Sequence, residues 1–380
     1  EAKCFYCNFA VDVSTDEQIH IGYVDALLRE LNTHADWLGQ TKIRGIDIGG
    51  GTPTRLSGRQ LERLCRALEP YTQSTGHAFP VSIETTPRIA SQEPDKLSIL
   101  SRGGVQRVSM GVQSFNAATL ALVNRRRQVE QTERAMANLR AAGFQRLNLD
   151  IIFGLPGQSL SDWLADLERI IALTPDSVTT YDCLYRGKGR ALTKIAPTTP
   201  TPAQYGAMYD AGYERLTQAG WHASYGSVNF SRRRDETGTS ACFEGRLLDG
   251  LPYLGLGNYA SSLRGNRWSF NTYSVGDYTQ RINAGANPCE YYYDLPAGEA
   301  QAKYILYSLN YGFIDEQRFR RRFGLGLQEA YPRELAYATT NGLLCQRGSH
   351  WGVTTGRFEH MHIIRSLFYP TAAREWLTSL

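Results

Sequence analysis

The sequence predicts an α/β protein whose parallel β-sheet is covered by helices. Short apolar runs typical of strands alternate with amphipathic segments typical of helices from residue 43 to residue 219. Glycine-rich or polar residues follow several of the apolar runs. Repeated strand–helix units of this length favour a parallel sheet with helices outside it. Because such crossovers are right-handed, the candidate architectures are an open doubly wound sheet and a barrel.

The alternation can be followed in order along the chain. Strands are predicted at residues 43–48, 79–83, 105–110, 146–153 and 177–181. Helices are predicted at residues 16–32, 57–68, 95–101, 117–124, 130–142, 160–172 and 202–219. The first of these helices has no strand before it, so we expect the strand that begins the repeat to precede Glu1.

The pattern changes after about residue 220. Residues 221–287 are dominated by Arg, Gly, Asn and Tyr and contain only short β-like pieces such as residues 253–255. Further helices are predicted at residues 298–312, 316–323, 327–340 and 358–368, with a β-like piece at residues 351–353. We therefore expect the chain to end in a small, mainly helical region with a β-wing.

The composition narrows the class of protein. Of the 380 residues, 42% are apolar and 21% are charged, which is typical of globular proteins and excludes general disorder. The sequence contains no run of about 18 apolar residues, so it predicts no membrane-spanning helix. The net charge is +4 without a basic tail, so we expect neither nucleic acid nor membrane as a partner. Seven cysteines in so large a chain favour a reduced, cytoplasmic location over a disulfide scaffold.

Cys4 and Cys7 are two thiols separated by two residues. Thiolates at this spacing hold iron or zinc, or form a redox disulfide. A zinc ribbon needs a second pair at similar spacing, and the other five cysteines offer none. The pair alone therefore leaves iron and redox chemistry open.

Polar or glycine-rich residues stand at the ends of four successive predicted strands. Gly49, Gly50 and Gly51 follow the first strand, and glycine lets a ligand approach the backbone closely. Free N–H groups in such a loop can receive an anionic group. The next three strand ends carry polar side chains at Glu84, Gln113 and Asp150. The carboxyl ends of parallel strands are where barrel proteins build their sites, so we expect a shared site there.

Taken in order, these motifs resemble the radical S-adenosylmethionine (SAM) enzymes, and within them the HemN-like branch. The matching motifs are Cys-Phe-Tyr-Cys at 4–7, Gly-Gly-Gly-Thr-Pro-Thr at 49–54, Glu84, Gly-Val-Gln-Ser-Phe at 111–115, and Asp150 followed by Gly-Leu-Pro-Gly-Gln at 154–158. The resemblance implies a partial (β/α)6 TIM-like barrel at residues 1–220. It further implies a barrel extension that covers the substrate at residues 221–297 and a HemN-like, mainly helical C-terminal domain at residues 298–380.

The resemblance also implies a [4Fe–4S] cluster held by a Cys-x3-Cys-x2-Cys motif, with SAM on the fourth iron. Cys4 and Cys7 match the second and third cysteines of that motif, and we expect the first directly before Glu1. Tyr6 matches the aromatic residue that packs near the adenine. The positions assigned by resemblance to SAM binding are Gly50, Gly51, Thr52, Glu84, Gln113, Arg125, Asp150, Leu184 and Ser261.

Within the HemN-like branch, the chain most resembles the class C radical SAM methyltransferases. This resemblance implies two SAM molecules and transfer of a SAM-derived methylene or methyl group to an sp2 carbon of a conjugated small molecule, by C-methylation or cyclopropanation. A reductant such as flavodoxin or ferredoxin is the implied protein partner. The candidates for the catalytic acid or base, after a late strand, are Tyr181, Asp182, Cys183 and Tyr185.

Aromatic residues in the middle of the chain favour this hypothesis, because they suit a pocket for a flat substrate. They are Tyr253, Tyr259, Trp268, Phe270, Tyr273, Tyr291, Tyr292 and Tyr293.

Three alternatives stay open. The first is an anaerobic haem-degrading methyltransferase, with His222, His360 and His362 as candidate haem contacts. The second is a coproporphyrinogen III dehydrogenase, although residues 181–188 depart from the Asn-Tyr-Ala-His pattern expected there. The third is a non-catalytic haem-binding chaperone on the same barrel, although no histidine follows Gly257 at the position expected in that branch.

Overall fold

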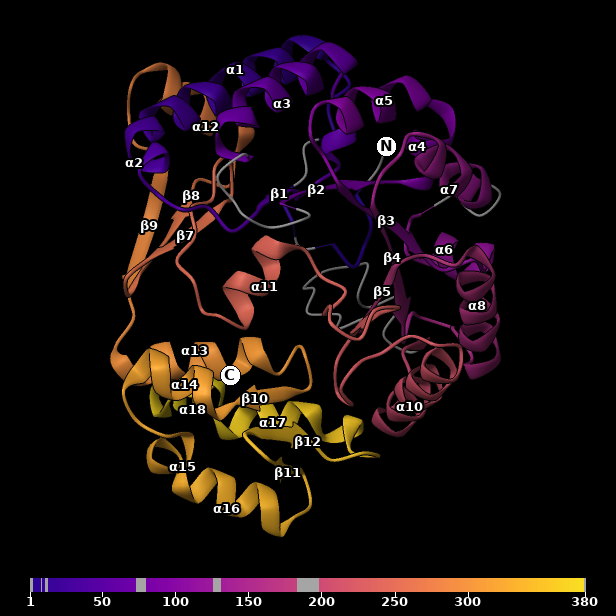
Figure 1. Ribbon diagram of the computed structural model, residues 1–380, viewed down its shortest axis with the longest axis vertical. Helices are drawn as coiled ribbons and strands as arrows, with labels where there is room; N and C mark the ends of the chain where they lie inside the picture. Colours follow the sequence, from indigo (N-terminus) through magenta and orange to yellow (C-terminus); the bar gives the residue numbers. More distant parts are fainter. Residues whose placement is uncertain are drawn as a thin grey trace.

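The computed structural model describes residues 3–7, 9–10, 13–72, 80–125, 131–182 and 198–378. A central β-sheet carries helices along its outer side, as Figure 1 shows. A second, three-stranded sheet lies beside helix α1, and the C-terminal helices form a separate group at the opposite end of the view. The predicted α/β class with a helical C-terminal region is confirmed.

The central sheet has the strand order β1-β2-β3-β4-β5-β6. Its strands are β1 (Ile46–Ile48), β2 (Val81–Thr85), β3 (Arg107–Gln113), β4 (Arg146–Phe153), β5 (Ser177–Asp182) and β6 (Asn229–Ser231). The first five strands are parallel, but β6 pairs with β5 in the antiparallel direction. His222 already forms an antiparallel bridge with Ser231, so the chain doubles back before it enters the sheet. In the described part of the chain no pairing joins β1 to β6, so the barrel is open.

Helices precede and follow the parallel strands along the chain. They are α1 (Glu17–Thr33), α2 (Ala35–Gly39), α3 (Gly58–Thr72), α4 (Pro87–Gln92), α5 (Pro94–Arg102), α6 (Ala117–Leu122), α7 (Thr132–Ala141), α8 (Leu160–Leu173) and α10 (Pro202–Gln218), with the 3-10 turn η1 (Pro53–Arg55). Helix α4 was not predicted, because Pro87 and Pro94 suggest breaks. Both prolines instead occupy the first turn of a helix, where the missing N–H costs nothing.

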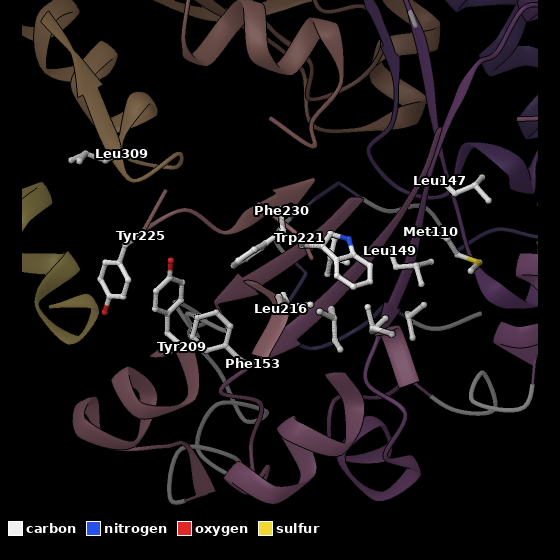
Figure 2. Packing of buried hydrophobic residues seen from close by; sticks show 14 of the residues in the cluster. Met110, Leu147, Leu149, Phe153, Tyr209, Leu216, Trp221, Tyr225, Phe230 and Leu309 are labelled. Carbon is white, nitrogen blue, oxygen red and sulfur yellow. The ribbon is translucent and has the colours of Figure 1, made fainter. Parts of the chain in front are cut away.

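The side of the central sheet that meets the helices is apolar. Alternate strand residues point to the same face, and Ile83, Met110 and Leu149 are each at most 1% exposed. Figure 2 shows Leu149 beside Trp221, with Met110 and Leu147 farther along the same cluster, which continues in the other direction to Tyr209 and Leu309. Burying each such side chain contributes roughly 1.5–3 kcal/mol, so this face anchors the sheet.

The middle of the chain contains more regular structure than the sequence predicted. It forms α11 (Ala241–Leu247), β7 (Ser261–Arg264), β8 (Arg267–Asn271), α12 (Val275–Asn283) and β9 (Cys289–Asp294). The three strands make an antiparallel sheet. Gly265, at φ +60, and Asn266 form the turn between β7 and β8, and this pair of residue types is a hairpin signal. Of the predicted β-like piece, only Tyr253 pairs, in a single bridge with Leu263.

The C-terminal region is mainly helical, as predicted. It contains α13 (Ala297–Ser308), β10 (Phe313–Asp315), α14 (Glu316–Phe323), α15 (Leu327–Ala330), α16 (Pro332–Thr340), β11 (Leu344–Arg347), β12 (His350–Val353), η4 (Phe358–His360), α17 (Met361–Leu367) and α18 (Thr371–Thr378). The predicted helix at residues 327–340 is broken, because Pro332 forces Tyr331 out of the helical conformation. No helix among the described residues is long and apolar enough to cross a membrane.

Glu30 joins helix α1 to the middle segment. It is 4% exposed, and its carboxylate accepts hydrogen bonds from Gly257 N (2.8 Å), Tyr278 Oη (2.6 Å) and Asn271 Nδ2 (3.0 Å). The three donors come from the loop before β7, from α12 and from β8. One side chain thus holds the three-stranded sheet and α12 against the barrel.

We predict that Glu30→Ala destabilises the protein by about 2–4 kcal/mol, because it leaves three donors without their acceptor. The measurement is the urea dependence of unfolding followed by circular dichroism. Glu17→Ala, an exposed change on the same helix, serves as control and should stay within about 0.5 kcal/mol of the parent. Equal stability of the two variants would contradict the role assigned to Glu30.

Candidate functional site

The inner face of the central sheet is polar. Strand alternation places one polar set opposite the apolar residues that meet the helices. The registers put Glu84 beside Ser109 and Asp150 beside Thr179. The polar residues on this face include Asp47, Ser82, Glu84, Arg107, Ser109, Arg146, Asn148, Asp150, Ser177, Thr179 and Tyr181.

Hydrogen bonds hold the middle of this face rigidly. Ser109 Oγ donates to both carboxylate oxygens of Asp150, at 3.1 and 3.0 Å. Asn148 Nδ2 lies 2.8 Å from Asp150 Oδ1 and 2.9 Å from Ser109 Oγ. Ser177 Oγ in turn donates to Asn148 Oδ1 at 2.8 Å. The orientation of Asp150 is therefore fixed by neighbours on three strands before any ligand binds.

Arg107 supplies positive charge at the base of the face. It is 8% exposed and donates to Ser82 Oγ (3.0 Å) and to the carbonyl of Gly238 (3.1 Å). Its guanidinium lowers the pKa values of Asp150 and Glu84 and so partly offsets their burial.

The glycine loop after β1 closes onto Glu84. Gly50 N donates to Glu84 Oε2 at 3.3 Å. A Cβ at Gly49 would lie 2.5 Å from Glu84 Oε1, and Gly50 has φ +112, which side chains rarely tolerate. The loop can therefore lie against the carboxylate only because both residues are glycine.

Beside this loop lies a cavity of about 100 Å³. Its walls come from the glycine loop, from the ends of β2 and β3, and from β4. The lining residues are Gly51, Thr52, Glu84, Thr85, Thr86, Ser109, Gly111, Arg125 and Asp150. Five positions assigned to SAM by resemblance are thus brought together in one place: Gly51, Thr52, Glu84, Arg125 and Asp150.

Two carboxyl groups share this cavity, and both are harder to ionise than usual. Burial raises the pKa of Glu84 to about 8, with a further contribution from Asp150. Burial likewise raises the pKa of Asp150, and Arg107 and Ser109 oppose the effect. A cationic group placed between these carboxyls would favour their ionised forms. The cavity is therefore suited to an ammonium or sulfonium group.

Tyr181 also faces this site. The residue is 45% exposed near the end of β5. Surrounding protein nevertheless raises its pKa, first through burial of the phenol and then through Asp150 and Glu84. At neutral pH Tyr181 is a neutral hydroxyl that can donate or accept one hydrogen bond.

The segment with Cys4 and Cys7 lies against Arg125. Arg125 Nη1 lies 2.8 Å from Tyr6 Oη, and Arg125 Nη2 donates to the carbonyl of Gly111. Cys7 N donates to Cys4 O at 3.1 Å, so a turn brings the two cysteines together. Burial raises the pKa of the Cys7 thiol. Arg125 therefore connects the cysteine turn directly to the wall of the cavity.

Gln113 has a strained backbone. Its φ of +72 is unusual for a residue with a side chain, and its Oε1 is buried without a hydrogen-bond partner. A buried acceptor left unpaired costs free energy, which a donating ligand would recover. Gly111 permits this conformation, since a Cβ there would lie 2.7 Å from Gln113 Nε2.

The residues present fit the cofactors that the resemblance implies. Cys4 and Cys7 offer the thiolates that iron–sulfur clusters use. Among the described residues there is no group of three or more His, Cys, Asp or Glu side chains placed to hold a metal. SAM has a cationic centre and hydroxyl groups, and the site suits both. The two neighbouring carboxyl groups of Glu84 and Asp150 suit the cation, and the unpaired Oε1 of Gln113 can accept a hydrogen bond.

Other assigned residues lie elsewhere. Ser261 is on β7, where its hydroxyl is 3.4 Å from Tyr253 Oη, and it is not in the cavity lining described above. Asp182 ends β5. Cys183, Leu184 and Tyr185 lie outside the described residues.

The middle aromatics do not together enclose a pocket. Several are exposed: Tyr259 by 41%, Tyr273 by 50%, and Tyr291, Tyr292 and Tyr293 by 47–58%. Phe270 and Tyr291 stack with ring centres 4.9 Å apart on neighbouring strands. These rings largely cover the three-stranded sheet instead of converging on the cavity.

Sequence reasoning missed Asp47, Arg107, Ser109 and Asn148. It considered the strand ends, whereas these residues lie earlier in their strands. A signal was present, because polar residues alternate with apolar ones in Arg-Val-Ser-Met at residues 107–110 and in Asn-Leu-Asp-Ile at residues 148–151. That alternation indicates a strand with one polar face and one apolar face.

Comparisons with known proteins agree with this geometry. Residues 1–170 match the radical SAM superfamily. The chain is 30% identical over 294 residues to the oxygen-independent coproporphyrinogen III oxidase of Escherichia coli, covering 75% of this chain and 64% of that protein. It is 25% identical over 348 residues to the heme chaperone HemW of Bacillus subtilis, covering 90% of each. The first part of the chain thus matches the radical SAM superfamily, and the chain as a whole is similar to HemN-like proteins.

The solved structure of coproporphyrinogen III oxidase (HemN) from Escherichia coli has the same fold. It superposes with a TM-score of 0.79 at 24% identity, covering 97% of this chain and 87% of that one. The chain spans less than two thirds of the length of the curated oxidase it matches. The methyltransferase subtype predicted from sequence is not supported, because these relatives are oxidases and heme chaperones.

The raised pKa of Glu84 predicts a pH dependence of stability. Unfolded glutamate ionises near pH ~4.3, whereas folded Glu84 keeps its proton to about pH 8. Between these values the folded state binds more protons, so stability falls as pH rises, by at most about 1.4 kcal/mol per pH unit.

Urea unfolding of the protein without SAM, measured from pH 5 to 8, tests this. Glu84→Gln should lose less stability across this range than the parent, while Glu17→Gln should follow the parent. Parallel profiles for the parent and Glu84→Gln would show that the carboxyl is already ionised at pH 5.

Proposed function

We propose that the chain is a radical SAM enzyme that binds SAM in the Glu84–Asp150 cavity and acts on a tetrapyrrole. The observation that carries the proposal is the juxtaposition of the cysteine turn with the polar cavity through Arg125. This arrangement lets one ligand reach both a thiolate-bound cluster and a set of fixed hydrogen-bonding groups.

The residues of this chain would divide the work of holding SAM. Gly51 and Thr52 offer backbone and hydroxyl groups to the amino acid part. Glu84 and Asp150 offset its cationic charge, and Asp150 is pre-oriented by Ser109. Arg125 can pair with a carboxylate.

A cluster held by Cys4 and Cys7, once reduced by one electron, would supply the reductive cleavage of bound SAM to methionine and a 5′-deoxyadenosyl radical. The protein supplies binding, orientation and protection of that chemistry. Tyr181 stands on the same face as Glu84 and Asp150, so it is the best-placed described candidate to hold or move a proton during turnover. Its high pKa means that it enters the reaction as a neutral donor.

The tetrapyrrole as substrate class rests on the printed functions of the relatives, which name coproporphyrinogen III and heme. The use of a second SAM molecule stays a prediction, and so does the reductant, a flavodoxin or ferredoxin. A heme chaperone without turnover is the competing function, favoured by the HemW relative that covers 90% of this chain.

We predict that the anaerobically reconstituted protein, given a reductant, cleaves SAM to 5′-deoxyadenosine. Cys4→Ala and Cys7→Ala should abolish the product, because each removes a cluster ligand. Cys345→Ala on β11 is the matched control and should retain activity.

Product analysis then distinguishes the functions. Loss of coproporphyrinogen III with 5′-deoxyadenosine supports an oxidase, and S-adenosylhomocysteine as a further product indicates methylene transfer. If the protein has its full iron content and binds heme but does not cleave SAM, the proposal that it is an enzyme is wrong.

We further predict that Asp150→Ala retains iron but lowers SAM cleavage by about tenfold or more, since one lost charge-assisted contact is worth about 1.5–3 kcal/mol. Iron content and product formation are measured on the same sample. Loss of iron together with activity would place Asp150 in cluster support and not in SAM binding.

A further inference from the structure

Three basic side chains surround a second, smaller cavity. Arg246 comes from α11, Lys303 from α13 and Arg322 from α14. The cavity has a volume of about 20 Å³, and its walls also include Leu263, Leu295 and Tyr307. It shares no lining residue with the Glu84 cavity.

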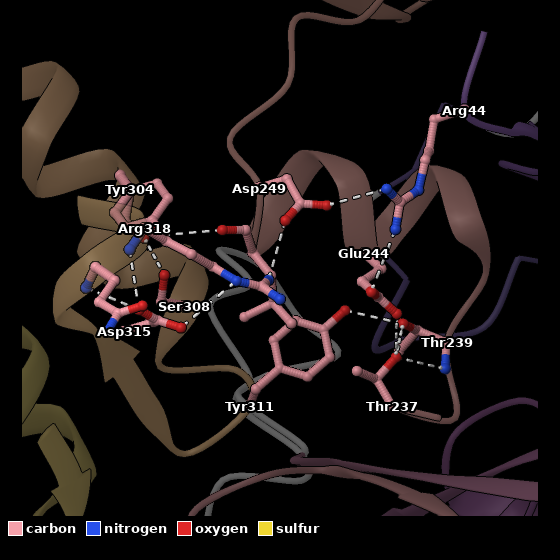
Figure 3. Close-up of polar contacts among 12 residues, drawn as sticks. Arg44, Thr237, Thr239, Glu244, Asp249, Tyr304, Ser308, Tyr311, Asp315 and Arg318 are labelled. Atoms are coloured by element: carbon pink, nitrogen blue, oxygen red, sulfur yellow. Dashed lines mark hydrogen bonds and ion pairs between the residues drawn. The ribbon is translucent and has the colours of Figure 1, made fainter. Parts of the chain in front are cut away.

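The nearby carboxylates are engaged with other partners. Asp249 pairs with Arg44 (3.6 Å) and Arg318 (3.1 Å), and Arg44 also pairs with Glu244 (3.5 Å). Figure 3 shows this network running from Arg44 past Asp249 to Arg318 and Asp315.

The three cations around the cavity have no such partners. Within the part of the chain that the structure describes, Arg246, Lys303 and Arg322 form no ion pair with a carboxylate. Arg246 acts on Asp47 through space, but Asp47 is held by Ser240, whose hydroxyl donates to it at 2.7 Å. Among the described residues, no carboxylate forms an ion pair with the positive charges at the cavity.

One donor in the cavity lining, and one on a ring next to it, are also left without acceptors. Arg246 Nε is buried and has no hydrogen-bond partner, and the same holds for Trp268 Nε1, on the ring beside Lys303. Arg322 donates to the carbonyl of Gly250, and a Cβ at Gly250 would lie 3.0 Å from its guanidinium. Gly250 thus lets Arg322 lie along the backbone at the rim.

Aromatic rings replace counter-ions around two of the cations. Lys303 Nζ lies 3.5 Å from the ring centre of Tyr307 and 4.6 Å from that of Trp268. The guanidinium of Arg246 lies 4.1 Å from the ring centre of Tyr253. Such contacts stabilise a cation only in part. Burial, and then the charges of Arg246 and Arg322, lower the pKa of Lys303 to about 7.

We propose that Arg246, Lys303 and Arg322 form a binding site for the carboxylate of a small organic acid. A carboxylate accepts from arginine donors in pairs and places one negative charge among the three cations. The cavity holds roughly one or two water-sized groups, which suits a carboxylate better than the larger phosphate. Leu263 and Leu295 offer apolar surface to the carbon chain of the acid. The site stands independently of the reaction proposed for the Glu84 cavity.

The charge state of Lys303 reports on the site. The chain has six lysines, so reductive methylation with ¹³C-formaldehyde, which keeps their charge, gives few NMR signals. Absence of one signal in Lys303→Arg assigns it. The whole protein is titrated in sodium chloride, sodium acetate and sodium phosphate at equal ionic strength.

We predict that Lys303 titrates near pH 7 in chloride and about one pH unit higher in acetate, because a bound carboxylate favours the charged ammonium. In Arg322→Met the midpoint should already be higher in chloride, since one repelling charge is gone, and acetate should shift it less. Arg321→Met, an exposed change on the same helix, is the control and should behave as the parent.

Two results would overturn the proposal. Equal midpoints in chloride and acetate for the parent would show that no carboxylate binds beside Lys303. An equal or larger shift in phosphate would show a general anion site without preference for carboxylates. The comparison within the parent protein decides the matter even where a variant folds poorly.

Discussion

The structure depends on the division of the central sheet into an apolar face and a polar face. Because side chains alternate along each strand, the sheet has these two faces. Burial of the apolar face lowers the free energy of the folded state, whereas burial of the carboxyl groups on the polar face raises it. Leu149 and its neighbours stabilise the fold by burial. On the other face, Asp150 and Glu84 are kept from bulk water at a cost, which shows in their raised pKa values. The apolar face provides the stability that allows the polar face to be prepared for a ligand.

Fixed hydrogen bonds make the polar face a site and not merely a wet surface. Asp150 is oriented by Ser109 and Asn148, and Asn148 is in turn held by Ser177. These contacts cross three strands, so the orientation is a property of the sheet. The glycine loop and Arg125 then connect this prepared face to the cysteine turn.

The sequence predicts much of this arrangement for clear reasons. Strand β4 was predicted with its observed bounds, because apolar residues alternate with polar ones and then run up to Gly154, where the strand pattern ends. Gly51, Glu84 and Asp150 were expected to lie together, because carboxyl ends of parallel strands meet at one edge. Other features depend on tertiary contacts. Arg107 and Asn148 acquire their roles only from neighbours across the sheet, and the antiparallel direction of β6 follows from a turn that local patterns do not reveal.

The most direct test of the central claim is a crystal structure of the anaerobically reconstituted protein with SAM. The account predicts iron bound by Cys4 and Cys7 and SAM in the cavity lined by Gly51, Glu84 and Asp150, with Gln113 Oε1 accepting a hydrogen bond. SAM bound away from the polar face, or iron without Cys4 and Cys7 among its ligands, would contradict it.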